Sequence, residues 1–294
     1  MTKNKDHLME RDQDILLFLW RWKLVSSAAL IFRFFPDCKA TSAYSKLLKL
    51  RRKKYIKTQN ISLREKGAAL SLTDKGFKFV KSALPELEKE AYKSDKVNHD
   101  FLCSAVHIGA WLDGAPDCGE VFSEQELKTY HKDFYPKWLP HLDSHRPDGH
   151  WYFDNSQKPE IISLEVEITP KKVARYTKVK DFYDYFDIIS NVIWVAADKP
   201  MAKRILKYLT LEGQFENKKH NFVLKNDILK KNWSSPIILG PNSNLTIYEF
   251  MQERSKRNGV GKDLVPSDPL LVDTRLYSVN SDDYTSRHSS KIIY

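Results

Sequence analysis

The sequence predicts an α/β protein (α+β overall) built in two parts, a basic helical beginning closed by a β-hairpin and a larger sheet domain behind it. Residues 11–56 carry three successive segments of helical apolar spacing, and residues 55–73 follow as two strand-like segments around a charged, glycine-containing turn. From residue 99 to residue 251, strand-like and helical segments alternate, which is the pattern of an α/β sheet.

The beginning of the chain has the element order of a winged helix-turn-helix. Ser26 or Ser27 caps the second helix, and Pro36 ends it because proline cannot continue the hydrogen-bond ladder. The third helix is expected at residues 41–56, and Thr73 caps a trailing helix after the hairpin. In this arrangement the third helix is the element that meets DNA.

Positive charge is concentrated in this first part. Residues 1–82 hold 19 Lys and Arg against 7 Asp and Glu, whereas residues 83–294 hold 29 against 31, and the whole chain has a formal net charge of +10. The asymmetry indicates a polyanionic partner, most simply double-stranded DNA. The alternative is that the basic run at residues 51–54 is only the solvated end of a helix. The residues expected to contact DNA are Thr41, Ser42, Ser45, Lys46, Lys49, Arg51, Arg52, Lys53, Lys54, Lys57, Arg64 and Lys66.

Composition argues against several other classes of protein. The longest apolar runs, at residues 16–20 and 192–197, are far shorter than the roughly 20 residues of a membrane-spanning helix, and no signal-peptide pattern opens the chain. We therefore expect a cytoplasmic protein without membrane contact. The three cysteines lack Cys-x-x-Cys spacing, which argues against both a disulfide framework and a cysteine zinc site.

Shifts in composition predict the domain boundaries. We expect a winged helix-turn-helix domain at residues 1–84, a charged linker at 85–98, an α/β domain at 99–251 and a polar tail at 252–294, partly disordered or docked as an arm. Within the α/β domain, strands are expected at residues 119–127, 149–153, 160–168, 191–198, 221–224 and 235–240, and helices at 98–112, 170–189 and 200–210.

The hairpin predicted at the centre of this domain places three acids together. If its two strands pair with Phe153 opposite Glu160, then Asp148 lies opposite Glu165, and Glu167 shares their face. Like charges placed so are unfavourable unless a cation or a basic side chain lies among them. Carboxylate oxygens are the ligands that hard divalent cations such as Mg²⁺ prefer.

In the predicted hairpin, an aspartate precedes one strand, the partner strand carries a pair of acids, and a basic helix follows. This arrangement resembles the PD-(D/E)XK nuclease core. The matching residues are Pro147, Asp148, Glu165, Val166 and Glu167. The family usually has lysine at the position of Glu167, and the basic residues that follow are candidates to replace it, namely Lys171, Lys172 and Arg175. The resemblance implies catalytic and metal-binding roles for the three acids, a catalytic role for Lys172, and Mg²⁺ or Mn²⁺ as the cofactor of an active site.

Four features follow one another along the chain: the winged helix, the RPDG sequence, the run LEVEITPKKVARYTKVKDFYDYF and the hydrophobic strand after it. Together they resemble the replication-relaxation family of bacterial plasmids and mobile elements, over roughly residues 10–210. The resemblance implies a DNA-binding protein that regulates replication, DNA relaxation, mobilisation or transcription, as a homodimer or with a replication or mobilisation partner. Its nuclease-like domain is expected to be degenerate. The alternative is a Mg²⁺-dependent DNA endonuclease or nickase.

The acids of the predicted hairpin and the histidines before it have alternative interpretations. The two acids of the second hairpin strand are alternatively a solvated strand face, paired with bases of the following helix. The histidines between residues 131 and 150 fall in a proline-interrupted stretch and are expected on the surface, although His145 or His150 near the acids would suit phosphate binding. Glu124 is a candidate for a further acid of the site.

Overall fold

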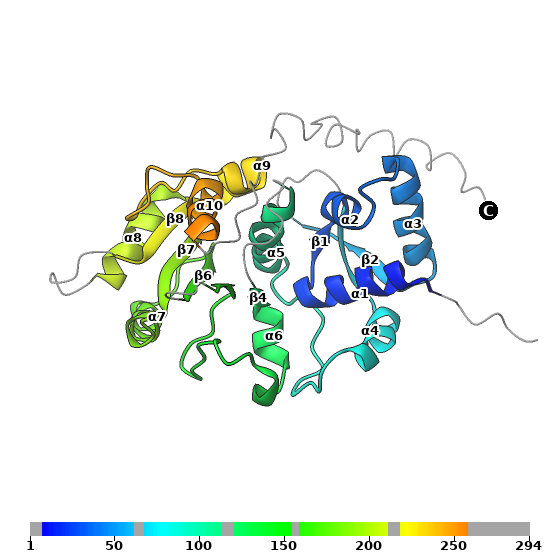
Figure 1. Cartoon of the computed structure of the whole chain (residues 1–294), viewed down its shortest axis with the longest axis horizontal. Helices are drawn as coiled ribbons and strands as arrows, with labels where there is room; N and C mark the ends of the chain where they lie inside the picture. Colours follow the sequence, from blue (N-terminus) through cyan, green and yellow to red (C-terminus); the bar gives the residue numbers. More distant parts are fainter. Residues whose placement is uncertain (1–7, 62–67, 113–119, 155–158, 211–217, 258–294) are drawn as a thin grey trace, which may run out of the picture.

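Two sheets organise the chain. The computed structural model describes residues 8–61, 68–112, 120–154, 159–210 and 218–257, and its structure is mixed α/β. Helices with a small antiparallel sheet form the N-terminal part, and a five-stranded mixed sheet with its own helices follows (Figure 1). Within the described ranges, no helix combines the length and the apolar character needed to cross a bilayer.

Hydroxyl caps begin two helices of the N-terminal part. Ser26 Oγ accepts a hydrogen bond from the backbone N–H of Ala29 at 3.1 Å, and Thr73 Oγ1 accepts one from Gly76 at 3.1 Å. Both caps satisfy otherwise unpaired backbone donors, as predicted. The elements are α1 (Glu10–Trp22), β1 (Val25–Ser26), α2 (Ser27–Phe34), α3 (Ala40–Arg52), β2 (Ile56–Gln59), β3 (Ala69–Leu72), α4 (Asp74–Val80) and the 3₁₀ turn η1 (Lys81–Ala83). The sheet has the order β1-β3-β2, with both pairings antiparallel.

The prediction for the third helix is wrong at its C-terminal end. α3 ends at Arg52, and Lys54 takes a positive φ of 62° that turns the chain into β2. Ile56 then pairs with β3, so tertiary pairing overrides the helical spacing of the sequence. The predicted basic tip of the hairpin, with Arg64 and Lys66, lies outside the described residues.

The second sheet is covered on both faces. Its order is β4-β5-β6-β7-β8; β5 is antiparallel to both β4 and β6, and β6, β7 and β8 are parallel. One face packs on α5, α9 and α10, and the other packs on α7 and α8. The strands are β4 (Glu120–Ser123), β5 (Gly149–Phe153), β6 (Glu160–Glu167), β7 (Ile189–Ala196) and β8 (His220–Leu224). The helices are α5 (Val97–Leu112), α6 (Glu124–Thr129), α7 (Val173–Tyr185), α8 (Lys199–Leu209), α9 (Lys225–Lys231) and α10 (Ile247–Arg257), with 3₁₀ turns η2 (Lys132–Phe134) and η3 (Asn232–Ser234).

The hairpin of β5 and β6 has the predicted register. Phe153 lies opposite Glu160. Just before β5, the backbone N–H of Asp148 donates to the carbonyl of Leu164 at 2.9 Å, which continues the pairing towards Asp148 and Glu165. The predicted juxtaposition of these two acids therefore follows from an observed strand pairing.

Two strand predictions in this part are wrong. The strand predicted at residues 119–127 stops at Ser123, because Ser123 and Glu126 form a capping box that begins α6. Residues 235–240 form only isolated β-bridges, one to β8 and one to the residue before α10. Ile237 is buried in the core on one face of the sheet, and Ile238 and Leu239 are partly buried on the other face, where they exchange two hydrogen bonds with Phe222 of β8.

The ends of the second part also differ from the predicted boundaries. α5 begins at Val97, inside the predicted linker of residues 85–98, and the tail predicted from residue 252 begins inside α10. Phe250 and Met251 bury one side of α10 against the sheet, and Arg254, one turn further, is buried with them. The polar composition of the sequence after residue 251 leads to the prediction of a tail instead of a helix, because only the inner side of α10 is apolar.

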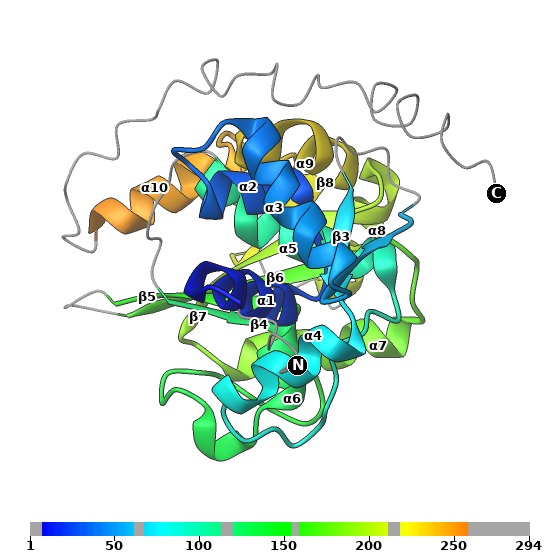
Figure 2. The same cartoon turned by 90° about the vertical axis from the view of Figure 1, so that its right-hand side faces the viewer.

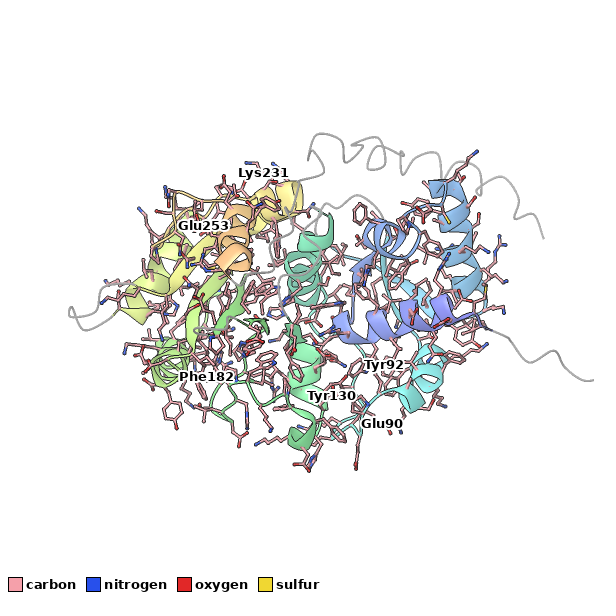
Figure 3. The ribbon with its side chains drawn as sticks, in the orientation of Figure 1. Glu90, Tyr92, Tyr130, Phe182, Lys231 and Glu253 are labelled. Atoms are coloured by element: carbon pink, nitrogen blue, oxygen red, sulfur yellow. The ribbon has the colours of Figure 1, made fainter. Side chains whose placement is uncertain are left out.

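A buried polar contact at the end of α1 joins the two parts. Lys23 Nζ, on a side chain that is 6% exposed, lies 2.7 Å from Glu124 Oε2 and 3.5 Å from Asp100 Oδ2. Burial alone would lower the pKa of Lys23, but the carboxylates of Glu124 and Asp100 outweigh it and leave the pKa raised. Trp20 stacks on Tyr130 with ring centroids 5.4 Å apart. Figure 2 shows α1 between α3 and α4, and Tyr130 lies where α6 meets these N-terminal helices (Figure 3).

Replacing Lys23 with alanine is expected to destabilise the protein strongly, because Asp100 and Glu124 would lose their buried cation. Breaking a buried ion pair from one side costs about 3–5 kcal/mol, which urea denaturation followed by circular dichroism would measure. Lys132→Ala is the matched control, since it removes an exposed pair with Asp143 and should change the unfolding free energy by less than about 0.5 kcal/mol. Equal effects of the two substitutions would contradict the role assigned to Lys23.

Candidate functional site

Asp148 lies just before β5 and is held from two sides. Its Oδ2 accepts a hydrogen bond from the backbone N–H of Val166 at 2.6 Å, and its Oδ1 lies 3.3 Å from His99 Nε2. Burial alone would raise the pKa of this carboxyl, but the His99 imidazole and the Val166 N–H outweigh it and keep the pKa below its usual value. The Asp148 carboxylate is therefore held in a fixed orientation by its two contacts.

The two acids of β6 reach towards α7. Glu165 Oε1 accepts a hydrogen bond from the Tyr183 hydroxyl at 2.5 Å and lies 2.6 Å from His145 Nε2. Glu167 Oε2 lies 2.6 Å from Lys171 Nζ. Burial raises the pKa of Glu167, the Lys171 ammonium opposes this, and the two neighbouring carboxylates raise the pKa further. The three predicted acids therefore interact electrostatically at one end of β6, and we refer to Asp148, Glu165 and Glu167 as the acid cluster.

The interpretation of the β6 acids as a solvated strand face is wrong, although the pairing with a following base that it included is observed between Glu167 and Lys171. Glu165 and Glu167 are 6% and 4% exposed, because α7 covers this face of β6. The expectation of surface histidines is wrong for two of the four: His145 is buried against α7, and His150 is buried with its Nδ1 2.9 Å from Ser163 Oγ. The other two histidines of the stretch are exposed.

Lys171 is the base that reaches the acid cluster. Lys172, to which sequence resemblance assigns this role, is the exposed N-cap residue of α7, and Arg175 is exposed in the first turn. Glu124, the further candidate acid, begins α6 instead of continuing a strand, and it pairs with the buried lysine at the end of α1. It lines the same small cavity as Asp148.

Two residues of α5 that the sequence patterns above do not single out complete the site. His99 and Cys103 lie one helical turn apart, with Cys103 Sγ 3.6 Å from His99 Nδ1. Their ligand atoms and one oxygen of Asp148 all lie within 4.8 Å of one another, which makes them a metal-capable group among the described residues. The i, i+4 spacing of His99 and Cys103 in the sequence NHDFLC is the signal that could have identified the pair. A search for Cys-x-x-Cys spacing alone does not detect it.

Behind the acid cluster, histidines pack in apolar surroundings. His107 lies between the indole rings of Trp22 and Trp151, with centroid distances of 4.9 and 4.2 Å. Gly149 has a φ of +148°, and a Cβ at this position would lie 2.4 Å from His107 Nε2, so the glycine of RPDG is required for the packing. Burial lowers the pKa of His107 and of His150 to about 3.

The DNA-contact residues predicted on α3 lie on its outer side. Ala43, Leu47 and Leu50 pack the inner side into the N-terminal core. Exposed on the opposite side and on the start of the hairpin are Thr41, Ser42, Ser45, Lys46, Lys49, Arg51, Arg52, Lys54 and Lys57, while Lys53 is half-buried. We call this set the basic face. α3 stands at the end of the molecule opposite to β7 and β8 (Figure 1), so the basic face is remote from that side of the second sheet.

Lowering the pH from 7 to 5 is expected to destabilise the protein through its buried histidines. An unfolded histidine takes up a proton near pH 6.5, whereas His107 stays neutral down to about pH 3, so its stability contribution is present above pH 6.5 and is lost as the pH falls. The loss is about 2 kcal/mol per such histidine at pH 5. His107→Phe should remove its share of the pH dependence of the unfolding free energy, and His131→Phe, at an exposed position, should not. Identical pH profiles for the wild type and both variants would refute the assignment.

Together, the acid cluster and the two α5 residues offer carboxylate, imidazole and thiol ligands, with Lys171 as a cation at the edge. Such a set of side chains is chemically able to hold a divalent cation and to contact an anion beside it. No protein-family model, curated protein or solved structure matches this chain.

Proposed function

We propose that this protein binds double-stranded DNA through a winged helix-turn-helix at its N-terminal end, with α3 in the major groove. The observation that carries the proposal is the basic face. Its hydroxyl and basic side chains are exposed along the whole of α3, while the inner side of the helix is anchored in the core. A rigid helix presented in this way supplies phosphate contacts and leaves polar groups at its N-terminal half for base edges.

The neighbouring elements support the same role for α3. α2 precedes α3 across the short turn of residues 35–39, as in a helix-turn-helix pair. Arg51 Nη1 donates to Thr58 Oγ1 of β2 at 3.3 Å, which ties the end of the helix to the hairpin. In the proposal, this hairpin is the wing, and Lys57 on β2 adds a phosphate contact beside the helix.

We further propose that the second sheet is a PD-(D/E)XK-like domain and that the chain is related to replication-relaxation proteins. The protein would then regulate replication, DNA relaxation, mobilisation or transcription of a plasmid or mobile element. An antiparallel hairpin that continues into parallel strands, with Asp148 at its start and Glu165 opposite, supports the domain assignment. Each member of the acid cluster is occupied by a donor of the protein itself, which supports a domain that has lost cleavage.

Reversing three charges of the basic face is expected to weaken DNA binding and to reduce its salt dependence. The triple variant Lys46→Glu, Lys49→Glu, Arg52→Glu removes three phosphate contacts, so the slope of log K against log salt should fall by roughly 2.7 and the affinity by roughly 10-fold or more. Fluorescence anisotropy of a labelled duplex at several salt concentrations measures both quantities.

The matched control reverses three exposed charges of α8, with Lys203→Glu, Arg204→Glu and Lys207→Glu. Both triple variants change the net charge of the chain equally, so a purely non-specific attraction would weaken in both. The proposal requires that only the α3 variant loses DNA affinity. Equal losses of affinity in both variants would contradict the assignment of α3 as the recognition helix.

A metal-dependent endonuclease is the second candidate function, and one observation favours it. Burial raises the pKa of Glu167, and the neighbouring carboxylates of Glu165 and Asp148 add to the rise, so three acids lie close enough to interact at a place where a divalent cation would relieve their repulsion. Lys171 stands beside Glu167 at 2.6 Å, close to the place where the nuclease family carries its lysine. One or two cations held there would activate water and stabilise the leaving oxygen.

For this candidate, supercoiled plasmid incubated with the protein and Mg²⁺ or Mn²⁺ is expected to be nicked. Asp148→Asn and Glu165→Gln should each reduce the nicking rate by about 100-fold or more, because each removes a metal ligand. Asp181→Asn, at an exposed position of α7, is the control and should retain the full rate. An intact plasmid with either metal would exclude the endonuclease and leave DNA binding as the activity.

A further inference from the structure

We propose that His99, Cys103 and Asp148 form a binding site for Zn²⁺. The site lies where α5 meets the start of β5, beside the junction with the N-terminal helices. It is independent of DNA binding by the basic face, and it calls for a metal that the oxygen ligands of the acid cluster alone would not select.

The spacing of the donor atoms suits a small tetrahedral ion. His99 and Cys103 are four residues apart on α5 and therefore project from the same side of the helix. Cys103 Sγ lies 3.6 Å from His99 Nδ1, and Asp148 Oδ1 lies 3.3 Å from His99 Nε2. One ion binds only one of these ring nitrogens, so one of the two distances joins two of its ligand atoms. Tetrahedral Zn²⁺, with Zn–S of about 2.3 Å and Zn–N of about 2.0–2.1 Å, separates its ligand atoms by roughly 3.3–3.6 Å. One oxygen, one nitrogen and the sulfur already lie within 4.8 Å of one another, so side-chain adjustments of about an ångström would complete the site.

The chemistry of the three donors selects the metal. A thiolate and an imidazole favour Zn²⁺ over Mg²⁺ and Ca²⁺, which require oxygen ligands. When His99 Nε2, the nitrogen next to Asp148, is the metal ligand, Asp100 Oδ1 at 3.2 Å from Nδ1 supplies the carboxylate that commonly orients a ligating histidine. Cys103 is 6% exposed, so its thiol is shielded from large reactants, whereas a metal ion can enter beside His99 and Asp148, whose side chains are 15% and 12% exposed.

A small cavity provides the space and the negative charge. It has a volume of about 10 Å³ and is lined by Cys103 and Asp148 together with Asp100, Glu124 and Lys23, among other residues. This volume is about that of one water molecule or ion. Three carboxylates line the cavity against Lys23 and Arg21, which leaves an excess of one negative charge on its lining. Three protein ligands leave one coordination position, which the cavity would fill with water.

Cobalt provides a direct test, because a cysteine ligand produces an intense sulfur-to-cobalt charge-transfer absorption in the near ultraviolet. The full-length protein is stripped with a chelator, dialysed and titrated with Co²⁺, and bound Zn²⁺ is then measured by mass spectrometry and by competition. We expect one ion per chain, the charge-transfer band, and its loss when Zn²⁺ displaces Co²⁺. Absence of both bound metals from the wild-type protein would overturn the proposal.

Variants separate this site from the alternatives. Cys103→Ser should abolish the band and His99→Gln should weaken binding by at least roughly 10- to 100-fold, the effect of losing even an outer partner of a metal ligand. A Cys38→Ser, Cys118→Ser double variant should keep the band, and so should Glu165→Gln. A band that survives Cys103→Ser, or that requires Glu165 instead, would overturn the assignment.

Near-ultraviolet circular dichroism establishes that each variant is folded. If Cys103→Ser does not fold, Cys103→Ala is used in its place. The anisotropy assay on the wild-type and charge-reversed proteins reports separately on the basic face. Failure of the zinc site and failure of DNA binding are therefore distinguishable.

Discussion

The antiparallel register of β5 on β6 is the constraint on which the candidate site depends. With Phe153 opposite Glu160, the hydrogen bond from Asp148 to the Leu164 carbonyl holds Asp148 at the end of the hairpin, next to Glu165. A slip of one residue would turn every side chain of β6 to the opposite face and would separate these acids. The φ of +148° at Gly149 belongs to the same constraint, because it lets His107 pack directly behind the turn.

Burial of the acid cluster sets its chemistry. Charges removed from water are tolerated only with close partners, and each acid has one: His99 for Asp148, Tyr183 and His145 for Glu165, and Lys171 for Glu167. These partners occupy the lone pairs that a cation would use. The same arrangement therefore explains both how the fold tolerates three neighbouring acids and why an ion binding there would compete with the protein's own donors.

α5 connects this site to the N-terminal part. Its Ile108 belongs to the N-terminal core, whereas its Leu102 and Val106 belong to the core of the second sheet. Asp100 on the same helix pairs with Lys23 at the end of α1, and His99 next to it contacts Asp148. A single helix therefore carries apolar and polar contacts in both directions, which makes the two parts of the described chain mechanically continuous.

The sequence by itself determined several local features, namely the caps at Ser26 and Thr73, the three helices followed by a hairpin in the N-terminal part, and the register of the β5–β6 hairpin, since these depend on spacing and on neighbouring residues. Only the tertiary structure decided where α3 ends, that α10 forms, and that both faces of β6 are buried. It also decided that Lys171, and not Lys172, is the lysine that contacts Glu167. It also brought His99 and Cys103 to Asp148. The reason is physical: alternation records which side chains share a face, but the partner of a buried charge comes from whichever distant segment packs on that face, and no local pattern encodes it.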